Sequence, residues 1–440
     1  MGHISVVGAG LAGCEAAWAA ANAGAHVTLI EMKPHKYTAA HHSPGFAELV
    51  CSNSFKAKRP DSAAGLLKQE LKLMGSVCMQ AALSCEVAAG GALAVDRELF
   101  SKTVTQLIKS HKHIKIEHRE ITDIGNVQGD AIIIATGPLT SEPLANSLKK
   151  LLGKSLSFYD AAAPIVAADS VDSELSFCAS RYGKNKDGDY VNCPMDKQQY
   201  EAFYQALITA ETVPLHEFEV EDGLPQFYEG CMPIEALAKR GKDAIRFGPM
   251  KPVGLTDPRT GHRPWAVLQL RRENAEGTML NLVGFQTNLK FGEQKRVFRM
   301  IPALHKAEFL RYGVMHRNTF IDSPRLLNSS FALKNNPRIF FAGQITGVEG
   351  YMESASSGII AGINAVRAAR QKEPFILPRQ TMMGALAAYI SDDSVKDFQP
   401  MGANFGIIPP LEQQVRDKKE RHAMLSHRAI NILKQKLVQL

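Results

Sequence analysis

The chain of 440 residues has no run of 18 consecutive apolar residues, and its N-terminus enters a short strand-like segment directly. A membrane-spanning helix needs about 20 largely apolar residues, and a secretory signal has a basic segment before its apolar one. N-myristoylation of Gly2 requires Ser or Thr at position 6, which here is Val6. We therefore expect no membrane span, no signal peptide and no lipid anchor.

Cysteine is also scarce. The seven cysteines are an odd number, and none of them forms a CxxC pair. Secreted disulfide-rich domains and structural zinc sites both show regular cysteine pairs. The sequence therefore predicts a cytoplasmic protein with free thiols, without a disulfide framework and without a metal site. Four cysteines lie on helix-like or strand-like stretches and are expected in the core, namely Cys14, Cys78, Cys85 and Cys178.

The excess of positive charge is modest, at +7, so its distribution matters more than its sum. Basic residues outnumber acidic ones from Lys239 to Arg272, from Lys290 to Arg317 and from Glu412 to Leu440. Clustered positive charge suits a polyanion larger than a cofactor. Solvated surface segments produce the same pattern, so both interpretations stay open for each stretch.

The first thirty-one residues carry the strongest local pattern. An apolar run from His3 to Val7 is followed by Gly-Ala-Gly-Leu-Ala-Gly, an alanine-rich segment from Cys14 to Gly24, and a second apolar run from Val27 to Glu31. A strand, GxGxxG, a helix and a second strand ending in an acidic residue form the fingerprint of a dinucleotide-binding βαβ unit.

Each residue of this fingerprint has a physical role. Gly8 permits the tight turn, Gly10 lets backbone N–H groups approach a pyrophosphate, and Gly13 lets the helix pack closely on the strand. Glu31 is expected to accept hydrogen bonds from a ribose. The motif alone does not separate FAD from NAD(P).

Two later segments favour FAD. The run Asp130 to Pro138 reads as a buried strand ending in Ala-Thr-Gly, a turn at which flavoprotein chains leave the nucleotide sheet. The segment Arg338 to Gln344 returns a strand to that sheet, and a small-residue helix then aims its N-terminus at the flavin. Tyr351 is expected to stack on the isoalloxazine ring. The cofactor-binding residues expected from these motifs are Gly8, Ala9, Gly10, Leu11, Ala12, Gly13, Glu31, Gly137, Gly343, Gln344, Gly350 and Tyr351.

A length of 440 residues with 45% apolar residues predicts two or three domains with packed cores. We expect an α/β fold, a Rossmann-like, glutathione-reductase-like FAD-binding domain with a large inserted α+β domain. Its FAD-binding parts are expected at 1–157 and 328–440, the second with a basic C-terminal helix, and the inserted substrate or RNA domain at 158–327. Beyond Pro378 we expect helices.

Two cysteines have polar surroundings that suit chemistry. Cys51 precedes Ser-Asn-Ser in a loop of small and polar residues, and Cys231 lies between Gly230 and Pro233 with basic residues soon after. A thiol of ordinary pKa needs a cation or a base before it acts as a nucleophile at neutral pH. A small core residue at Cys51 and an inert turn residue at Cys231 remain alternatives. Cys193, before a proline, resembles Cys231 in its context.

Eight stretches of the chain resemble those of the folate- and FAD-dependent bacterial tRNA uracil-5-methyltransferases, a family related to larger flavoproteins that modify wobble uridines. The resemblance runs from about His3 to the C-terminus, with one departure: the family often has Trp where this chain has Phe291 before GEQKR. The stretches are FAELVCSNSFKA, IATGPLTS, GDYVNCPMD, YEGCMPIE, RFGPMKPVGL, NLVGFQTNLKFGEQKRVFRMIP, YGVMHRNTF and FFAGQITGVEGYMESASSG.

The resemblance implies methylation of uridine 54 at C5 in the T-loop of tRNA. A thiolate must add to uracil C6 before C5 becomes nucleophilic, and similarity assigns this role to Cys231 and a base or supporting role to Cys51. Methylenetetrahydrofolate is the implied donor, its methylene group passes through flavin N5, and NAD(P)H restores the reduced flavin. The target base must be extruded from the folded RNA.

Two alternatives stay open at this level. The same chemistry could act on ribosomal RNA, or the chain could be an NAD(P)H-dependent flavin oxidoreductase with a non-RNA substrate. The sequence does not indicate the preference between NADH and NADPH, the folate-binding residues or the oligomeric state.

Overall fold

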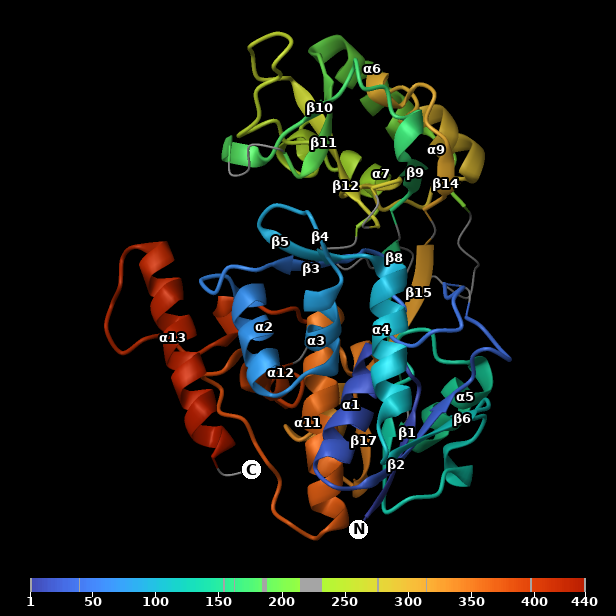
Figure 1. Cartoon of the computed structure of the whole chain (residues 1–440), viewed down its shortest axis with the longest axis vertical. Coiled ribbons are helices and arrows are strands. Elements are labelled where there is room, and N and C mark those ends of the chain that lie inside the picture. The colour runs from blue at the N-terminus through green and yellow to red at the C-terminus, as the bar shows by residue number, and fades with distance from the viewer. Residues whose placement is uncertain are drawn as a thin grey trace.

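The computed structural model describes residues 2–38, 40–152, 155–161, 163–183, 188–213, 232–274, 277–313, 315–395 and 398–438. Figure 1 shows two lobes, one above the other. We name the lower one the Rossmann-like lobe (residues 2–152 and 320–438) and the upper one the inserted lobe (residues 163–313).

A six-stranded sheet organises the Rossmann-like lobe. Its order is β16-β17-β7-β1-β2-β6, and all neighbours are parallel except β16, which pairs antiparallel with β17. The strand order therefore reverses between β1 and β7, which is where open α/β sheets bind ligands. The strands are β1 (His3–Val7), β2 (His26–Glu31), β6 (Ile114–His118), β7 (Ala131–Ile134), β16 (Ala332–Leu333) and β17 (Asn336–Phe341). A small sheet lies beside it, formed by β3 (Ser54–Ala57), β4 (Glu86–Val87) and β5 (Ala92–Val95).

Helices cover this sheet, and two of them pack unusually closely. A Cβ atom on Gly358 or Gly362 of α11 would lie 2.2 Å from the Ala12 carbonyl oxygen or 2.5 Å from that of Ala16 in α1. Only glycine permits so close an approach. The packing against α11 therefore fixes the position of α1. The helices of this lobe are α1 (Leu11–Asn22), α2 (Ala63–Leu73), α3 (Val77–Ser84), α4 (Arg97–Ser110), α5 (Glu142–Leu152), α10 (Ser323–Leu326), α11 (Tyr351–Ala369), α12 (Met382–Tyr389) and α13 (Lys418–Leu437).

A two-stranded antiparallel ribbon leads out of the Rossmann-like lobe and back, formed by β8 (Ser155–Ala161) and β15 (Met315–Ile321). Above it, the inserted lobe is built on an antiparallel sheet of order β10-β11-β12-β13-β9-β14. Its elements are β9 (Ile165–Ala167), β10 (Phe177–Cys178), β11 (Tyr190–Met195), α6 (Lys197–Thr209), α7 (Ile234–Ala238), α8 (Ala244–Phe247), β12 (Ala266–Arg272), β13 (Met279–Leu282), α9 (Phe291–Phe298) and β14 (Phe309–Arg311).

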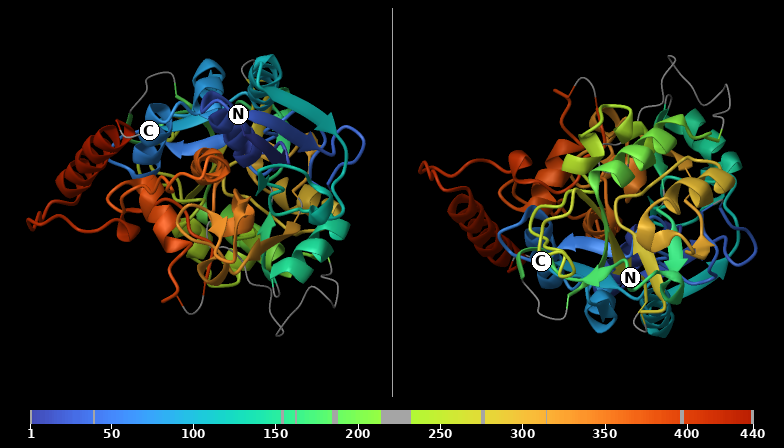
Figure 2. Two further views of the ribbon diagram at one scale, coloured as in Figure 1. Left: turned by 90° about the horizontal axis from the view of Figure 1, so that it is seen from below. Right: turned by 90° about the horizontal axis from the view of Figure 1, so that it is seen from above.

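Each lobe has its own hydrophobic core. One cluster of buried residues belongs to the Rossmann-like lobe and extends from Ile4 to Leu433, and another lies within the inserted lobe between Val166 and Ala307. Helix α13 lies at one side of the lower lobe in both views from the ends (Figure 2). We propose the domain boundaries 1–157, 158–327 and 328–440. They lie close to the ribbon, although Phe320, Ile321 and Leu327 pack in the core of the Rossmann-like lobe.

The structure corrects two expectations. Cys178 is exposed, because β10 is a two-residue edge strand in which the buried Phe177 takes the inward position and its neighbour points outward. Cys193, whose context resembles that of Cys231, is fully buried in β11, where burial raises the pKa of its thiol. Between α12 and α13 the chain is mostly irregular, since several prolines and glycines interrupt it. Cys14, Cys78 and Cys85 are buried, as predicted.

Candidate nucleotide-binding and thiol site

A deep cavity opens at the carboxyl edge of the six-stranded sheet. Its walls come from the ends of β1, β2, β7 and β17, and from the first turns of α1 and α11. Because the strand order reverses at this edge, the loops that follow β1 and β7 diverge and leave a crevice between them. All twelve cofactor-binding residues predicted from the sequence lie in or beside this region, and ten of them line the cavity directly: Gly8, Ala9, Gly10, Leu11, Ala12, Glu31, Gly137, Gly343, Gln344 and Tyr351.

The glycine-rich turn leaves space where a phosphate group fits. Gly10 is the N-cap of α1 at φ −72°, a conformation open to any residue, and no side chain caps the helix. A Cβ atom on Gly10 would meet no heavy atom within 4 Å, so the position faces open space. The first N–H groups of a helix have no partner within the helix, and they attract anions. This turn therefore fits a pyrophosphate.

The other two glycines serve the fold. Gly8 has φ +99°, and a Cβ atom there would lie 2.6 Å from the Ala135 carbonyl oxygen. A Cβ atom on Gly13 would lie 1.8 Å from the Gly8 carbonyl oxygen. Both positions therefore require glycine because neighbouring backbone occupies the space.

The carboxylate of Glu31 is fixed at the end of β2. Its two oxygens accept hydrogen bonds from Ala9 N at 2.7 Å and from Lys33 N at 2.9 Å. A carboxylate accepts about four hydrogen bonds, so acceptor capacity remains for a ribose in the cavity. Glu31 also connects the glycine-rich turn to β2, a role that the motif did not predict.

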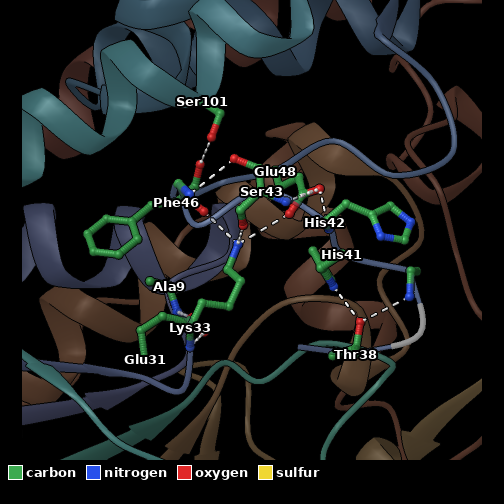
Figure 3. Close-up of polar contacts among 12 residues, drawn as sticks. Ala9, Glu31, Lys33, Thr38, His41, His42, Ser43, Phe46, Glu48 and Ser101 are labelled. Carbon is green, nitrogen blue, oxygen red and sulfur yellow. Dashed lines mark hydrogen bonds and ion pairs between the residues drawn. The ribbon is translucent and has the colours of Figure 1, made fainter. Parts of the chain in front are cut away.

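The loop that follows β2 is held over the cavity by a buried lysine. Lys33 Nζ lies 3.1 Å from the Ser43 carbonyl oxygen and 3.3 Å from the Glu48 carboxylate (Figure 3). It also donates to the Gly45 carbonyl oxygen at 2.5 Å. The same carboxylate accepts the His42 and Ser43 N–H groups. Such a buried cation is stable because it is paired and fully hydrogen-bonded. Lys33 thus fixes this side of the cavity.

His41 belongs to the same loop and lines the cavity. Its Nδ1 lies 2.6 Å from the Thr38 hydroxyl (Figure 3). Burial lowers the pKa of His41, and Glu48 opposes that shift. The imidazole is therefore neutral near pH 7 and offers a hydrogen bond rather than a charge.

Cys51 lies at the inner end of the cavity against the first residue of α11. The Tyr351 hydroxyl accepts hydrogen bonds from Cys51 N at 2.9 Å and Ser52 N at 3.3 Å, and lies 3.1 Å from Cys51 Sγ. A hydroxyl has two lone pairs and one proton. Since both lone pairs serve the backbone N–H groups, the Tyr351 proton points to the sulfur. Burial, and then the neighbouring Cys51, raise the pKa of Tyr351 well above its usual value, so it stays a donor.

The inserted lobe grips the loop that carries Cys51. Arg271, at the end of β12, donates to Ser52 Oγ and Asn53 Oδ1, both at 2.9 Å. The Asn53 side chain is fully buried and donates in turn to the Val95 and Arg272 carbonyl oxygens, both at 2.9 Å. The Ser-Asn pair after the thiol is therefore a joint between the two lobes.

A second arginine grips the same loop from the Rossmann-like lobe. Arg97 donates to the Leu49 and Val50 carbonyl oxygens at 2.7 and 2.9 Å and forms an ion pair with the buried Glu273 of the inserted lobe. Burial is also the main cause that lowers the pKa values of Arg271 and Arg311, whose charges interact with Cys51. The positive charges of Arg271 and Arg311 therefore act on the sulfur of Cys51.

A second cavity adjoins the first on the other side of Cys51 and Tyr351. The two cavities share Cys51, Gln344, Tyr351 and Ser354. The second one is also lined by Phe55, Lys56, Leu67, Gln286, Gly350 and Glu353, among others. The thiol therefore faces a place where two ligands would meet. Gly350 and Gly13, which do not line the first cavity, support it from α11 and α1.

Cys231 lies outside the described residues, so the structure does not test its role. Reasoning from the sequence missed Arg97, Arg271 and Lys33, because only their place in the fold distinguishes them from other basic residues. Among the residues that the structure describes, no group of three His, Cys, Asp or Glu side chains could hold a metal ion. Within the same residues, no helix is long and apolar enough to cross a membrane.

Comparison with protein families gives one match over most of the chain. The family described as Glucose inhibited division protein A matches residues 3–373. Relatives named methylenetetrahydrofolate–tRNA-(uracil-5-)-methyltransferase TrmFO match even more fully. That of Geobacter sulfurreducens is 55% identical over 429 residues, covering 98% of this chain and 97% of the relative. That of Anoxybacillus flavithermus is 53% identical over 439 residues, covering all of both chains.

Solved structures support the fold. The structures of Aquifex aeolicus GidA in its crystal forms II and I superpose with TM-scores of 0.70 and 0.71 at 16% and 17% identity. They cover 99% of this chain and 73% and 76% of the GidA chain. The predicted α/β, Rossmann-like fold is therefore confirmed.

Proposed function

Because this chain belongs to the Glucose inhibited division protein A family, and within it to the methylenetetrahydrofolate–tRNA-(uracil-5-)-methyltransferases, we propose that it methylates C5 of uridine 54 in the T-loop of tRNA. The donor is methylenetetrahydrofolate and the cofactor is FAD. The observation that carries this proposal is the position of the Cys51 thiol, at the junction of a dinucleotide cavity and a second cavity.

The residues of the first cavity fit FAD. The uncapped N-terminus of α1 and the open space beside Gly10 suit its pyrophosphate, and Glu31 suits its ribose. Gly137 and Gly343 line the same cavity, and Gln344, Gly350 and Tyr351 lie with Cys51 where it meets the second cavity, which is where the ring system would lie. When bound, the flavin supplies one-carbon and hydride transfer chemistry.

The cysteines supply what flavin chemistry cannot. The uracil C5 atom becomes nucleophilic only when a thiolate bonds to C6, and we assign this role to Cys231. After C5 has formed its new bond to carbon, the C5 proton must leave so that the C6–sulfur bond can break. We assign the acceptance of that proton to Cys51, whose surrounding arginines favour the thiolate.

Two finer points complete the proposal. NAD(P)H restores the reduced flavin, since each methyl group formed from a methylene consumes two electrons. We also place the reaction in the cytoplasm, where thiols stay reduced and tRNA, folate and NAD(P)H are present together.

The decisive test incubates purified protein with an unmodified tRNA transcript, labelled methylenetetrahydrofolate and NAD(P)H. A matched transcript in which only U54 is changed serves as the control. We expect label in the first RNA and none in the second. No label in either, with NAD(P)H still consumed, would contradict the proposal and favour an oxidoreductase with another substrate.

Cysteine variants test the assigned roles. Cys231→Ala should abolish methyl transfer and prevent any covalent complex with a 5-fluorouridine-containing RNA, because no thiolate is available for C6. Cys51→Ala should still form the covalent complex with the 5-fluorouridine-containing RNA. With an ordinary transcript it should yield no methylated product. The reverse pattern would exchange the two assignments, and full activity of either variant would refute that variant's role.

A further inference from the structure

An aromatic side chain stands open to solvent on the inserted lobe. Phe247, the last residue of α8, is 73% exposed and is the most exposed aromatic residue in the described part of the chain. Exposing so large an apolar surface costs free energy, unless a partner covers it. A single exposed ring is common on protein surfaces, so the groups around Phe247 decide whether it belongs to a binding surface.

Phe247 is the last member of a series of cation–π contacts in which cations and aromatic rings alternate. The guanidinium carbon of Arg246 lies 5.4 Å from the centre of the Phe247 ring and 3.8 Å from that of Trp265. Lys197 Nζ lies 5.6 Å from the centre of the same indole. Arg246 is fixed further by its Nε, which donates to the Trp265 carbonyl oxygen at 3.0 Å. Arg246 thus lies between the rings of Phe247 and Trp265.

A second exposed aromatic residue lies against the loop that follows. Tyr182 is 68% exposed, and its ring would meet a Cβ atom on Gly254 at 2.9 Å. Its backbone has φ +62°, a left-handed conformation that is costly for tyrosine, and its N–H donates to the Gly254 carbonyl oxygen at 2.8 Å. Backbone strain that displays an aromatic ring to solvent is typical of functional surfaces.

The same segment carries more basic than acidic side chains, and only some of its cations have acidic partners. Lys242, Arg246 and Arg259 have carboxylate partners. Three further cations are exposed and form no ion pair with any described residue, namely Arg240, Lys251 and Arg263. Lys239 is exposed as well, but its charge acts on the carboxyl group of Glu235. Exposed rings beside unneutralised cations match a single-stranded or looped nucleic acid, whose bases stack on aromatic rings while its phosphates bind cations.

Strand β12 connects this surface to the thiol. Trp265 directly precedes β12, and Arg271 near the other end of the strand holds the loop of Cys51. Six residues of extended strand span about 20 Å. A nucleic acid of about six stacked nucleotides, at about 3.4 Å each, covers that distance.

We infer that the surface formed by Phe247, Tyr182 and the cations Arg240, Lys251 and Arg263 binds the RNA substrate near the start of β12, with an unpaired base stacked on Phe247. This inference rests on the proposed tRNA substrate and adds the residues that hold it. It requires no change in the catalytic chemistry.

The first experiment measures the affinity of the FAD-bound protein for an unmodified tRNA transcript by fluorescence anisotropy. Phe247→Ala should weaken binding about tenfold, since loss of one base–aromatic stack costs between about 5- and 150-fold. Phe247→Trp should restore affinity, because an indole stacks as well as a phenyl ring. Leu83→Ala removes another exposed apolar side chain, from α3 of the Rossmann-like lobe, and serves as the control.

The second experiment separates stacking from charge through the dependence of affinity on salt. Lys251→Ser and Arg263→Ser should each reduce the slope of log Kd against log salt by about 1, whereas Phe247→Ala should leave the slope unchanged. Lys112→Ser is the control. Helix α4 contacts the inserted lobe through Arg97 at its start, and Lys112 follows the other end of this helix, about 20 Å away.

Three outcomes would overturn the inference. Wild-type affinity for tRNA in Phe247→Ala, while the wild-type protein methylates tRNA, refutes this surface and leaves the proposed function intact. Equal weakening by Phe247→Ala and Phe247→Trp refutes stacking. A change in sedimentation of Phe247→Ala without a change in RNA affinity assigns the surface to contact between copies of the chain. If the wild-type protein failed to methylate tRNA, that result would instead contradict the proposed function.

Discussion

Gly10 and Gly13 belong to the same turn, yet a side chain would meet different surroundings at the two positions. At Gly10 it would project into the cavity, and at Gly13 into the Gly8 carbonyl oxygen. Gly10→Val should therefore fold and lose FAD, because its methyl groups occupy the space of the pyrophosphate. Gly13→Val should fail to fold. Flavin absorbance of the purified protein and its melting temperature measure both effects.

Gly292 provides the matched control for this pair. A Cβ atom there also meets nothing within 4 Å, but the residue lies in α9 of the inserted lobe. Gly292→Val should retain both fold and flavin. A yellow, FAD-saturated Gly10→Val protein would show that the cofactor does not bind at this turn.

Arg271 makes a second prediction at the scale of single residues. Arg271→Met removes both hydrogen bonds to the Ser52 and Asn53 side chains and should let the loop of Cys51 shift. Displacement of a reacting group by about 1 Å can cost about 100-fold in rate. We therefore expect kcat for methyl transfer to fall about 100-fold, with a changed pH dependence of Cys51 alkylation by iodoacetamide.

Its neighbour in sequence provides the control. The Arg272 side chain is exposed, and only its backbone carbonyl oxygen contacts the loop. Arg272→Met should keep the wild-type alkylation profile. If Arg271→Met kept that profile as well, Arg271 would not position the thiol.

The two arginines also mark the limit of sequence reasoning at this scale. The glycines and Glu31 could be predicted because their roles depend on a local spacing. Cys51 was recognised by its polar neighbours, but its contact with Tyr351 joins residues 300 positions apart. Arg271 and Arg272 look alike in sequence, and only the alternation of β12 sends one toward the loop and the other to solvent.

At the scale of elements, the first N–H groups of two helices donate to buried carboxyl groups that belong to other helices. Glu70 of α2 accepts the N–H groups of Met382 and Met383 in α12 at 2.7 and 2.8 Å. Glu15 of α1 accepts those of Val77 and Cys78 in α3 at 3.2 and 3.0 Å. Burial raises the pKa of Glu70 to about 8 and that of Glu15 to about 7, although the N–H groups oppose the shift.

The raised pKa of Glu70 predicts how stability varies with pH. Between its ordinary value of 4.5 and about 8, Glu70 binds a proton in the folded state but not in the unfolded chain. Folding then takes up a proton, so the free energy of unfolding falls as pH rises through this range and levels off above it. One such group contributes a slope of about 1.4 kcal/mol per pH unit.

Glu70→Gln should remove that slope, because glutamine does not titrate. Urea unfolding between pH 5.5 and 7.5 measures the difference from the wild-type protein. Glu98→Gln, at an exposed position of α4, should keep the wild-type slope. Equal slopes in all three proteins would mean that Glu70 is ionised throughout this range.

Individual elements were predictable where the period of the sequence is strong. The first strand was expected from His3 to Val7, as observed, and the helix that follows begins three residues earlier than expected. The antiparallel strands of the inserted lobe were not assigned, since their partners are distant and their runs are short. The context of Cys193 before Pro194 resembles that of Cys231, but Cys193 lies in β11, which accommodates this proline.

At the scale of the whole molecule, the two cores meet across a polar joint. Its contacts are the ion pair of Arg97 with Glu273, the Arg271 hydrogen bonds and a bond from the Tyr190 hydroxyl to the Ala89 carbonyl oxygen at 3.0 Å. Joints of this kind couple lobes weakly. We expect calorimetry of the apoprotein to resolve two unfolding transitions, one for each core.

FAD should raise only one of the two transitions. A ligand at 100 times its Kd stabilises its site by about 2.7 kcal/mol, which corresponds to roughly 5–10 °C for a lobe of this size. The transition of the inserted lobe should stay within a degree of its original temperature. A single transition that moves as a whole would show that the joint makes the lobes one cooperative unit.

The ribbon of β8 and β15 has a consequence for how the protein is made. The ribbon and the inserted lobe that it carries place about 200 residues between β7 and its sheet neighbour β17. A ribosome adding roughly 5–20 residues per second needs about 10–40 s to traverse that distance. During this time β7 offers an open edge to other nascent chains, and α1 lacks the helix that packs against it. The inserted lobe thus completes its fold first, and the cofactor cavity closes only when nearly the whole polypeptide has left the exit tunnel.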